Sequence, residues 1–352
     1  MAETAFDTAR YREQQVAAFS ARIPFDSPTV IEFGGKPFGD YHATRVLPGY
    51  DPDVKAGIIR SVHSELSSRS LGGAVITMAV HAKDLLAHPD GRRPNARIRG
   101  DYGVTYDVEV FRMAEEARNR FGIDIANVAI TATPRVLSKT GDDFIRSYSE
   151  KLGEEFDKVV ILPEIAGYPY LPPENVIGEL TSAEAIAKPY QSELVVSPGG
   201  GSGKFSVAVT EIAHKLKAGV SPQYIKFETF PVFHLPTTHP LNKAFIAATA
   251  DLANELVELD NGETNYDKDI GNFALLQNLL AAFPDVQTPM RSFGRPTDMG
   301  VNVIESGIVD AEAIRAACDQ EIVRRTRRYL AEIIGGNESQ IALDNIQRLT
   351  AS

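Results

Sequence analysis

The chain has 352 residues, which is enough for a large buried core and for more than one domain. Its formal net charge of −11 creates a long-range negative field, which argues against general binding to nucleic acids but still permits a small anion in a local pocket. The single cysteine, Cys318, excludes an intramolecular disulfide and a cysteine-based zinc site, and the lack of a signal peptide or a long apolar run predicts a cytoplasmic protein without a membrane span.

Six short apolar runs recur along the first two thirds of the chain. Each has four to seven residues, is rich in Val and Ile, and lacks the strict alternation of a half-exposed strand. Such runs are typical of strands that are buried on both faces. The predicted strands are residues 30–33, 74–80, 126–131, 158–162, 193–196 and 224–227.

Segments with helix start and stop signals lie between these strands. The expected N-caps are Asp51 followed by Pro52, Asp107, and either Asp142 or Asp143, and the expected helix ends are Gly122 and Gly153. The alternation of strand and helix predicts an α/β fold, with a mostly parallel, Rossmann-like or P-loop-like sheet and flanking helices.

The pattern becomes helical after Pro231. Helices are predicted over residues 240–259 and 270–283, and Asp310 is expected to cap a long helix over residues 311–334. We therefore expect a helical subdomain in addition to the sheet. The predicted divisions are an α/β core at 1–235, a helical or mixed subdomain at 236–309 and a C-terminal helical segment at 310–352.

The last long helix combines a cysteine with a run of arginines. We expect Cys318 to be a packed or half-exposed thiol. Charge runs on helices are usually solvated, so the arginines predict an exposed basic face, and a contact with another subunit or domain is the alternative. These arginines are Arg324, Arg325, Arg327 and Arg328.

The strongest chemical signal is the glycine loop at residues 197–204, which stands between a Val-rich strand and a predicted helix. A strand, a glycine loop and a helix in this order present free backbone N–H groups and a positive helix end to an anion. Lys204 stands where a phosphate-loop lysine would stand. We expect phosphate to bind at Gly199, Gly200, Gly201, Ser202, Gly203 and Lys204. The alternative is a tight turn with an exposed lysine.

The loop departs from the known nucleotide motifs. The triphosphate pattern requires Gly at position 198 and Ser or Thr at position 205, where this chain has Pro198 and Phe205. Phosphate binding is therefore supported, and Mg²⁺-dependent hydrolysis of a triphosphate is not. The dinucleotide pattern G-x-G-x-x-G fails because Lys204 occupies its last position. The sequence has no H-E-x-x-H, so no metal site is predicted, and the expected cofactor stays open: a nucleotide, with or without Mg²⁺.

Four further polar segments follow predicted strands or precede helices, where open α/β sheets bind ligands. Glu228 and Asp298 are the expected base or metal ligand, and they join Lys204 as proposed catalytic residues. The other residues expected near the ligand are Gly34, Gly35, Lys36, His42, Arg45, Arg99, Asp101 and Asn302. The alternative for each segment is a turn with surface charges.

These segments together resemble a known family. They are 32–36 (EFGGK), 40–49 (DYHATRVLPG), 99–101 (RGD), 198–204 (PGGGSGK), 226–231 (KFETFP) and 296–302 (PTDMGVN). Their identity and order resemble the bacterial domain-of-unknown-function 1846 family, from about residue 6 to residue 330. Many members carry Gly-Pro-Gly-Ser-Gly-Lys, whereas this chain has Gly-Gly-Gly-Ser-Gly-Lys at 199–204.

The resemblance implies a cytoplasmic bacterial protein with an α/β core and no established activity. Members are sometimes labelled ATP-dependent zinc peptidases, but no zinc motif is found in this sequence. The resemblance also implies a further C-terminal α/β domain, so this chain is expected to be a short member or a fragment.

Three functional hypotheses follow. The protein is an enzyme that transfers or hydrolyses a group on a nucleotide or phosphorylated metabolite; or it is a non-catalytic ligand-sensing or protein-interaction module; or the glycine turn is empty and structural. The expected partner is a small phosphate-bearing molecule rather than nucleic acid or a membrane. A homo-oligomer is expected on general grounds.

Overall fold

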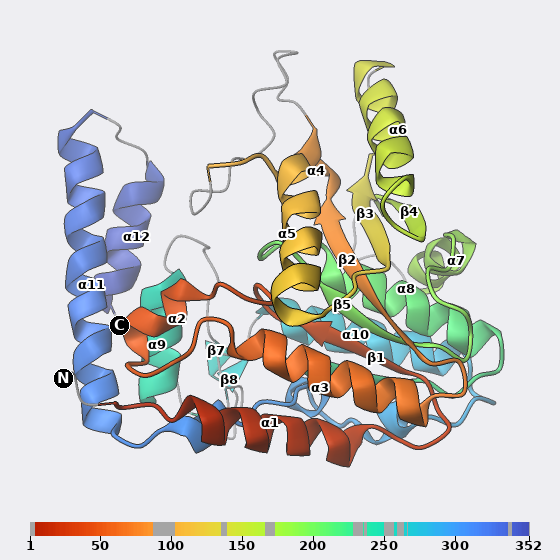
Figure 1. Ribbon diagram of the computed structural model, residues 1–352, viewed down its shortest axis with the longest axis horizontal. Helices are drawn as coiled ribbons and strands as arrows, with labels where there is room; N and C mark the ends of the chain where they lie inside the picture. Colours follow the sequence, from red (N-terminus) through yellow and green to blue (C-terminus); the bar gives the residue numbers. More distant parts are fainter. Residues whose placement is uncertain are drawn as a thin grey trace.

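The computed structural model describes residues 4–86, 103–134, 139–165, 173–227, 235, 238–249, 257–258, 264–265, 267–336 and 340–351. A six-stranded sheet forms its centre (Figure 1). The strands are β1 (Thr29–Phe33), β2 (Ala74–His81), β3 (Asn127–Thr133), β4 (Lys158–Pro163), β5 (Ser192–Val196) and β6 (Gln223–Phe227). Their order across the sheet is β4-β3-β2-β5-β1-β6, and every neighbouring pair is parallel. The predicted strands and fold class are confirmed.

Helices cover both faces of the sheet. The helices of the described residues are α1 (Thr8–Arg22), α2 (Tyr41–Val46), α3 (Val54–Arg69), α4 (Ala82–Leu85), α5 (Tyr106–Phe121), α6 (Lys139–Gly153), α7 (Pro173–Ser182), α8 (Lys204–Lys217), α9 (Pro240–Thr249), α10 (Asp267–Ala282), α11 (Ala311–Ile334) and α12 (Gln340–Ala351), of which α12 packs on α9 and α11 and not on the sheet. Short 3-10 helices lie at Pro289–Ser292 (η3), Pro296–Met299 (η4) and Ile304–Gly307 (η5), and β7 (Val257–Glu258) pairs with β8 (Thr264–Asn265).

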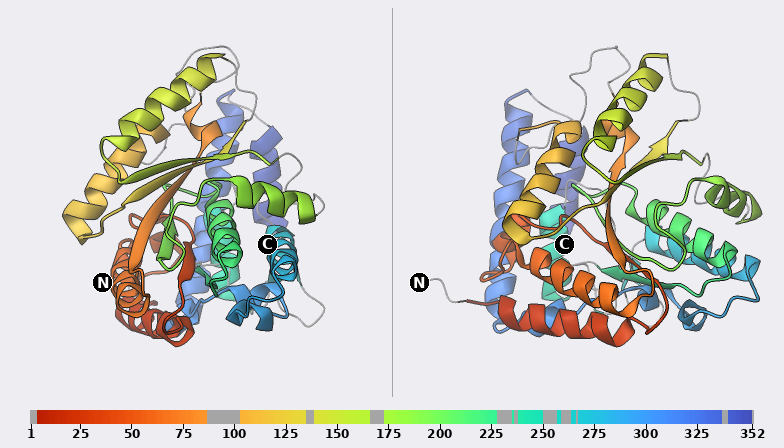
Figure 2. Two further views of the ribbon diagram at one scale, coloured as in Figure 1. Left: turned by 90° about the vertical axis from the view of Figure 1, so that its right-hand side faces the viewer. Right: turned by 45° about the vertical axis from the view of Figure 1, so that its right-hand side comes forward.

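The direction in which the chain crosses the sheet decides which face each helix covers. From β1 to β4 the chain moves toward one edge, and from β4 to β6 it moves back. Because crossovers between parallel strands are right-handed, the two directions place their helices on opposite faces. One buried cluster accordingly joins the sheet to α1, α3, α5 and α6, and another joins it to α7, α8 and α10 (Figure 2).

Several predicted helix boundaries were wrong. Helix α5 begins at Tyr106 with Thr105 as its N-cap, so Asp107 lies inside the first turn instead of capping it. Helix α6 begins at Lys139, ahead of the expected Asp142 or Asp143. Both cases place an acidic residue in the first turn rather than at the cap, and the helix macrodipole favours a negative charge at either position. The helix predicted over residues 240–259 does not reach residue 259, because α9 spans Pro240–Thr249 and Val257–Glu258 form the strand β7.

The long C-terminal helix α11 begins and ends where the sequence indicated. The Asp310 carboxylate accepts hydrogen bonds from the backbone N–H groups of Glu312 and Ala313, and Gly335 follows its last residue. The exposed basic face was predicted correctly for Arg324, Arg327 and Arg328 but wrongly for Arg325, which is only 3% exposed. Arg325 is buried because it belongs to the inward stripe of α11, which consists of Ile314, Cys318, Glu321, Arg325 and Tyr329.

The C-terminal half shares its core with the sheet. Side chains from α9 and α11, including Leu241 and the fully buried Cys318, belong to the cluster on the α1 and α3 face, and α10 and Met299 belong to the cluster on the α8 face. The division at residues 235 and 309 stays a prediction. None of the helices in the described part of the chain is long and apolar enough to cross a membrane.

Candidate functional site

The glycine loop leaves the sheet where the chain changes direction. Strand β5 lies between β2 and β1, and the chain leaves β1 and β2 toward helices on one face but leaves β5 toward α8 on the other. Neighbouring connections that separate in this way create a crevice at the carboxyl ends of the strands, where open α/β sheets bind their ligands. The loop at residues 197–203 occupies this position.

The loop is held by its own polar groups. The hydroxyls of Ser197 and Ser202 both donate to the carbonyl oxygen of Gly199, over 2.7 and 3.0 Å. The Lys204 ammonium donates to Ser197 Oγ over 3.0 Å and is buried. Gly200 and Gly201 are exposed at the tip. The lysine is therefore folded against the loop, not extended into solvent as the structural alternative required.

Gly203 forms the joint between the loop and α8. Its φ of +82° is in the left-handed region that favours glycine, and a Cβ at this position would lie 2.2 Å from Thr131 Oγ1 on β3. The same Thr131 hydroxyl donates to the carbonyl oxygen of Ser202 over 2.9 Å. The loop therefore reaches across the end of β2 to β3.

The end of β3 is strained and carries a buried hydroxyl. Ala132 has a φ of +50°, and the register between β3 and β4 shifts around it. Among the described residues, Thr133 Oγ1 is buried and has no hydrogen-bond partner. Strained backbone and unsatisfied polar atoms cluster at ligand sites more often than elsewhere, so both features mark this edge.

The N-terminus of α8 faces this edge without a side-chain cap. Gly203 is the N-cap residue and makes no side-chain hydrogen bond. Within the described part of the chain, the backbone N–H groups of Gly201, Gly203, Phe205 and Ser206 have no hydrogen-bond acceptor. Free N–H groups at the positive end of a 14-residue helix form a site for an anion.

His81, the last residue of β2, stands beside Thr131, which holds the loop, and the sequence analysis did not single it out. Its Nδ1 accepts a hydrogen bond of 3.2 Å from the backbone N–H of Lys83, and it lies in register with Thr131. Burial and the neighbouring Lys83 ammonium lower the pKa of His81 to about 4, so the imidazole is neutral at pH 7. No motif marks this histidine, because only the pairing of β2 with β3 places it beside Thr131.

A second group of polar residues follows β1 on the same edge of the sheet. The Lys55 ammonium on α3 is buried, pairs with the Asp40 carboxylate over 3.0 Å, and donates to the carbonyl oxygen of Gly34 over 3.2 Å. Burial disfavours the charged form of Asp40, but Lys55, His42 and Lys36 outweigh it and lower the pKa of the Asp40 carboxyl. Gly35, with a φ of +67°, brings the chain within reach of Lys55.

Helices α2 and α11 bring further cations to this group. Arg45 pairs with Glu321 over 3.7 Å, and Glu321 also accepts hydrogen bonds from Arg324 and Arg325. Desolvation, followed by the nearby Lys36 and Arg325, lowers the pKa of His42, although Asp40 acts in the opposite direction. We call Lys36, His42, Arg45, Lys55 and Arg325 the basic cluster. The sequence indicated three of these residues and missed Lys55 and Arg325.

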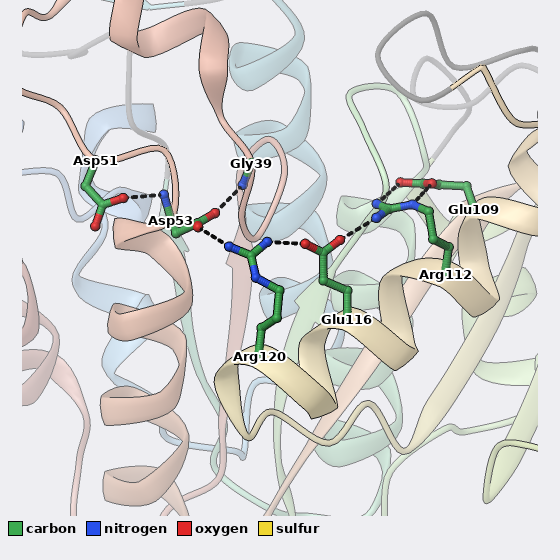
Figure 3. A network of polar contacts seen from close by, with 7 residues as sticks. All are labelled: Gly39, Asp51, Asp53, Glu109, Arg112, Glu116 and Arg120. Carbon is green, nitrogen blue, oxygen red and sulfur yellow. Dashed lines mark hydrogen bonds and ion pairs between the residues drawn. The ribbon is translucent and has the colours of Figure 1, made fainter.

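A network of ion pairs joins the loop after β1, which carries Lys36, to α5 (Figure 3). The Asp53 carboxylate accepts from the backbone N–H of Gly39 over 2.9 Å and pairs with Arg120 of α5 over 2.7 Å. Arg120 also pairs with Glu116, which pairs in turn with Arg112. Phe38 packs on Phe121 at 5.0 Å between ring centroids. The loop after β1 is thereby anchored to α5.

The described contacts of Asp298 and Asn302 lie outside the glycine loop. Asp298 caps a turn by accepting from the N–H groups of Gly294 and Arg295, and it lines a surface recess of about 640 Å³ with Arg22 and Gln223. Gln223 is the first residue of β6, so this recess lies at the amino ends of the strands, whereas the loop lies at their carboxyl ends. The Asn302 carboxamide oxygen accepts from the N–H of Ile304. Arg99, Asp101 and Glu228 lie outside the described residues.

The described residues contain no group of three or more His, Cys, Asp or Glu side chains arranged to hold a metal ion.

Another signal that the sequence analysis did not use is the spacing within α11. Glu321 and Arg325 stand at positions i and i+4 on a stripe that otherwise carries apolar residues or Tyr329. Polar residues on a buried stripe are costly unless they are paired, so that spacing indicates an internal ion pair.

The chain is similar to known proteins. The family model described as "Domain of unknown function DUF1846, N-terminal" matches residues 4–352. A "UPF0371 protein" of Clostridium botulinum (strain Alaska E43 / Type E3) is 32% identical over 333 residues, which cover 91% of this chain and 60% of that protein. A "UPF0371 protein" of Streptococcus pneumoniae (strain JJA) is 33% identical over 359 residues, which cover 99% of this chain and 67% of that protein. The chain thus spans 60% to 67% of the length of these relatives.

Proposed function

Because the chain belongs to the DUF1846 family, whose description names no activity, we propose a function from the site itself: the protein binds a phosphate-bearing small molecule at the glycine loop. The ligand is a nucleotide or a phosphorylated metabolite. The family that the motifs indicated is confirmed, and the match extends beyond residue 330 to the end of the chain.

One observation carries the proposal. The N-terminus of α8 has no side-chain cap, and among the described residues the N–H groups of Gly203, Phe205 and Ser206 lack acceptors, at the point where the chain changes direction across the sheet. Open donors of this kind are costly if they stay desolvated, and a phosphate satisfies several of them at once. Lys204 stands one residue after Gly203 and adds a cation to the same place.

The residue after Lys204 argues against the triphosphate chemistry of the usual phosphate loop. Phe205 is 8% exposed and packs edge-on against Tyr224, with 6.0 Å between the ring centroids. In the Mg²⁺-dependent loop this position carries a hydroxyl that holds the metal. Position 205 belongs instead to the core under α8, which favours phosphate binding without that metal contact.

The basic cluster supports an anionic ligand at the same edge. Four residues of the basic cluster, Lys36, Arg45, Lys55 and Arg325, and the neighbouring Arg324 contribute five positive charges. Asp40 and Glu321 contribute two negative ones, so these seven side chains carry a net charge of about +3. The whole chain carries −11. A local positive region on an acidic protein attracts a small anion to that region while the rest of the surface repels polyanions.

The test is thermal unfolding of the wild type and of Lys204→Ala with inorganic phosphate, AMP, ATP, GTP and glucose 6-phosphate, each with and without Mg²⁺. A ligand at 100 times its Kd stabilises the folded protein by about 2.7 kcal/mol. We expect a shift in Tm in the wild type that Lys204→Ala abolishes. Lys217→Ala is the matched control, since Lys217 lies at the exposed C-terminal end of the same helix.

The outcomes separate the hypotheses. A shift that Lys204→Ala loses and Lys217→Ala keeps places the ligand at the loop and identifies its chemical class. A shift that survives in Lys204→Ala contradicts the loop as the binding site. If the wild type shows no shift with any of the five compounds, the phosphate proposal fails for this chain.

A further inference from the structure

The side chain of His81 leaves the sheet on the face that carries the glycine loop. Side chains along a strand alternate between the faces. Thr77 and Ala79, which share the parity of His81 on β2, point toward α8, because Thr77 donates to Glu193 and Ala79 belongs to the cluster under that helix. Val80 belongs to the cluster on the other face.

The neighbour of His81 on β3 contacts the loop directly. His81 is in register with Thr131, and paired strands lie about 4.8 Å apart. The Thr131 hydroxyl donates to the carbonyl oxygen of Ser202 and closely approaches Gly203. On the other side of β2 stands β5, from which the loop begins. His81 is therefore placed between the start of the loop and the residue that holds its end.

The tautomer of the imidazole follows from its backbone contact. Because Nδ1 accepts the N–H of Lys83, the proton of the neutral ring is on Nε2. Burial and Lys83 lower the pKa to about 4, which keeps the ring neutral near pH 7. Among the described residues no acceptor is found for Nε2, and the side chain is partly exposed, so a ligand can reach it.

We propose that His81 is a ligand-binding residue of the glycine-loop site, and that its Nε2–H donates a hydrogen bond to a phosphate oxygen held by the loop. This inference rests on the proposed function. The backbone N–H groups and Lys204 approach the phosphate from α8, and His81 approaches it from the end of β2. A neutral donor adds a directed hydrogen bond without adding a second cation beside Lys204.

Two conservative substitutions separate this role from a structural one. His81→Asn keeps an acceptor near the position of Nδ1, so the contact with the Lys83 N–H is retained while the distal donor is lost. His81→Gln places an amide N–H near the position of Nε2 but loses the contact with Lys83. A structural role as the cap of α4 needs only the first contact, and ligand binding needs only the second.

Binding of inorganic phosphate by isothermal titration calorimetry decides between these roles. We expect His81→Asn to unfold at the wild-type temperature and to bind phosphate at least tenfold more weakly, and His81→Gln to bind within threefold of the wild type. If His81→Asn binds as tightly as the wild type, the inference is overturned while the proposed function stands. If the wild type binds none of the five compounds, both are overturned. If a nucleotide or glucose 6-phosphate binds and inorganic phosphate does not, the same variants are titrated with that compound, and the same outcomes decide.

Nitrogen chemical shifts of histidine provide a second readout that an Asn or Gln folding defect does not affect. In wild-type protein with ¹⁵N-labelled histidine, we expect His81 to show the tautomer with the proton on Nε2 at pH 7, and its Nε2–H proton to move downfield when phosphate is added. A proton on Nδ1, or a Nε2–H signal unchanged at saturating phosphate, would contradict the proposed hydrogen bond.

Discussion

The two ends of β5 lie under the same helix and use polar residues in opposite ways. At the amino end, Glu193 accepts from Thr77, and Glu211 of α8 accepts from the backbone N–H groups of Ile186 and Ala187 and pairs with Lys215. These side chains are fully buried. Both oxygens of Glu211 accept hydrogen bonds, whereas Glu193 Oε2 has no hydrogen-bond partner among the described residues. At the carboxyl end, the loop and the start of α8 expose N–H groups that have no acceptor in the described part of the chain.

The comparison distinguishes polar groups that other groups of the protein satisfy from polar groups that are left open for a ligand. Buried polar groups are tolerated where every donor meets an acceptor, and open donors persist where a ligand supplies the acceptor. The amino end of β5 should therefore be sensitive to substitution in the absence of ligand, whereas the carboxyl end should be sensitive mainly where its backbone geometry is disturbed.

The largest expected effect is at Glu211. Glu211→Ala removes the acceptor of two backbone N–H groups and leaves the buried Lys215 ammonium without its carboxylate. Breaking a buried ion pair from one side costs about 3–5 kcal/mol, so we expect a loss of that size in the free energy of unfolding, measured by urea denaturation. Glu211→Gln, which keeps an acceptor oxygen, should lose less. A loss below about 1 kcal/mol for the Ala variant would contradict the structural role.

The next effect is at the carboxyl end and depends on backbone geometry. Gly203→Ala places a Cβ 2.2 Å from Thr131 Oγ1 at a φ of +82°, whereas Gly201→Ala, at a φ of +75°, meets nothing within 4 Å. The left-handed conformation alone costs about 1–2 kcal/mol in either variant, and crowding should destabilise Gly203→Ala by about 1–3 kcal/mol more. Thermal unfolding of both variants measures the difference. Equal melting temperatures would contradict the close contact between Gly203 and β3.

The third effect is a pH dependence at the amino end. Burial and the neighbouring Glu211 raise the pKa of Glu193 to about 8, although Thr77 and Lys215 act in the opposite direction. Because the folded state binds this proton more tightly than the unfolded state, Glu193 stabilises the fold fully at pH values below its unfolded pKa of about 4.5. This stabilisation is lost as the pH rises through the folded pKa of about 8. Since one pKa unit corresponds to about 1.4 kcal/mol, stability should fall by at least that amount between pH 5 and pH 8.

Glu193→Gln tests this assignment because it resembles the protonated acid at every pH. The variant should show a flatter stability profile between pH 5 and pH 8 and should be the more stable protein at pH 8. Urea denaturation at both pH values measures the two slopes. Parallel profiles for variant and wild type would assign the pH dependence to another group.

The smallest expected effect lies outside both ends, in the network of Figure 3. The Arg120 side chain is 49% exposed although it pairs with Asp53 and Glu116. Exposed ion pairs contribute about 0.2–1 kcal/mol, so Arg120→Ala should destabilise the protein by no more than that, and less at 1 M salt. Arg118→Ala, at a more exposed pair with Asp124, should have almost no effect and serves as the control. A larger loss of stability in Arg120→Ala would contradict this prediction and would show that the network stabilises the loop after β1 more strongly than exposed ion pairs usually do.

The site was predictable from the sequence only in part. The glycine loop and three residues of the basic cluster were found because each stands directly after an apolar run, and the carboxyl ends of parallel strands share one edge. Asp298 was grouped with them by the same chemical reasoning, yet it follows no strand and lies with Gln223 at the opposite edge. Residue type predicted its polarity, and only the path of the chain fixed its position.

The sequence by itself determined the six strands, the cap of α11 at Asp310 and the loop that leads into α8, because apolar periodicity, capping residues and glycine act over a few neighbouring positions. The tertiary structure decided the strand order, and with it the placement of His81 beside Thr131, and it brought Arg45 of α2 to Glu321 of α11. These contacts join residues far apart in the chain, and their energies depend on burial and charge neighbours that no local pattern contains.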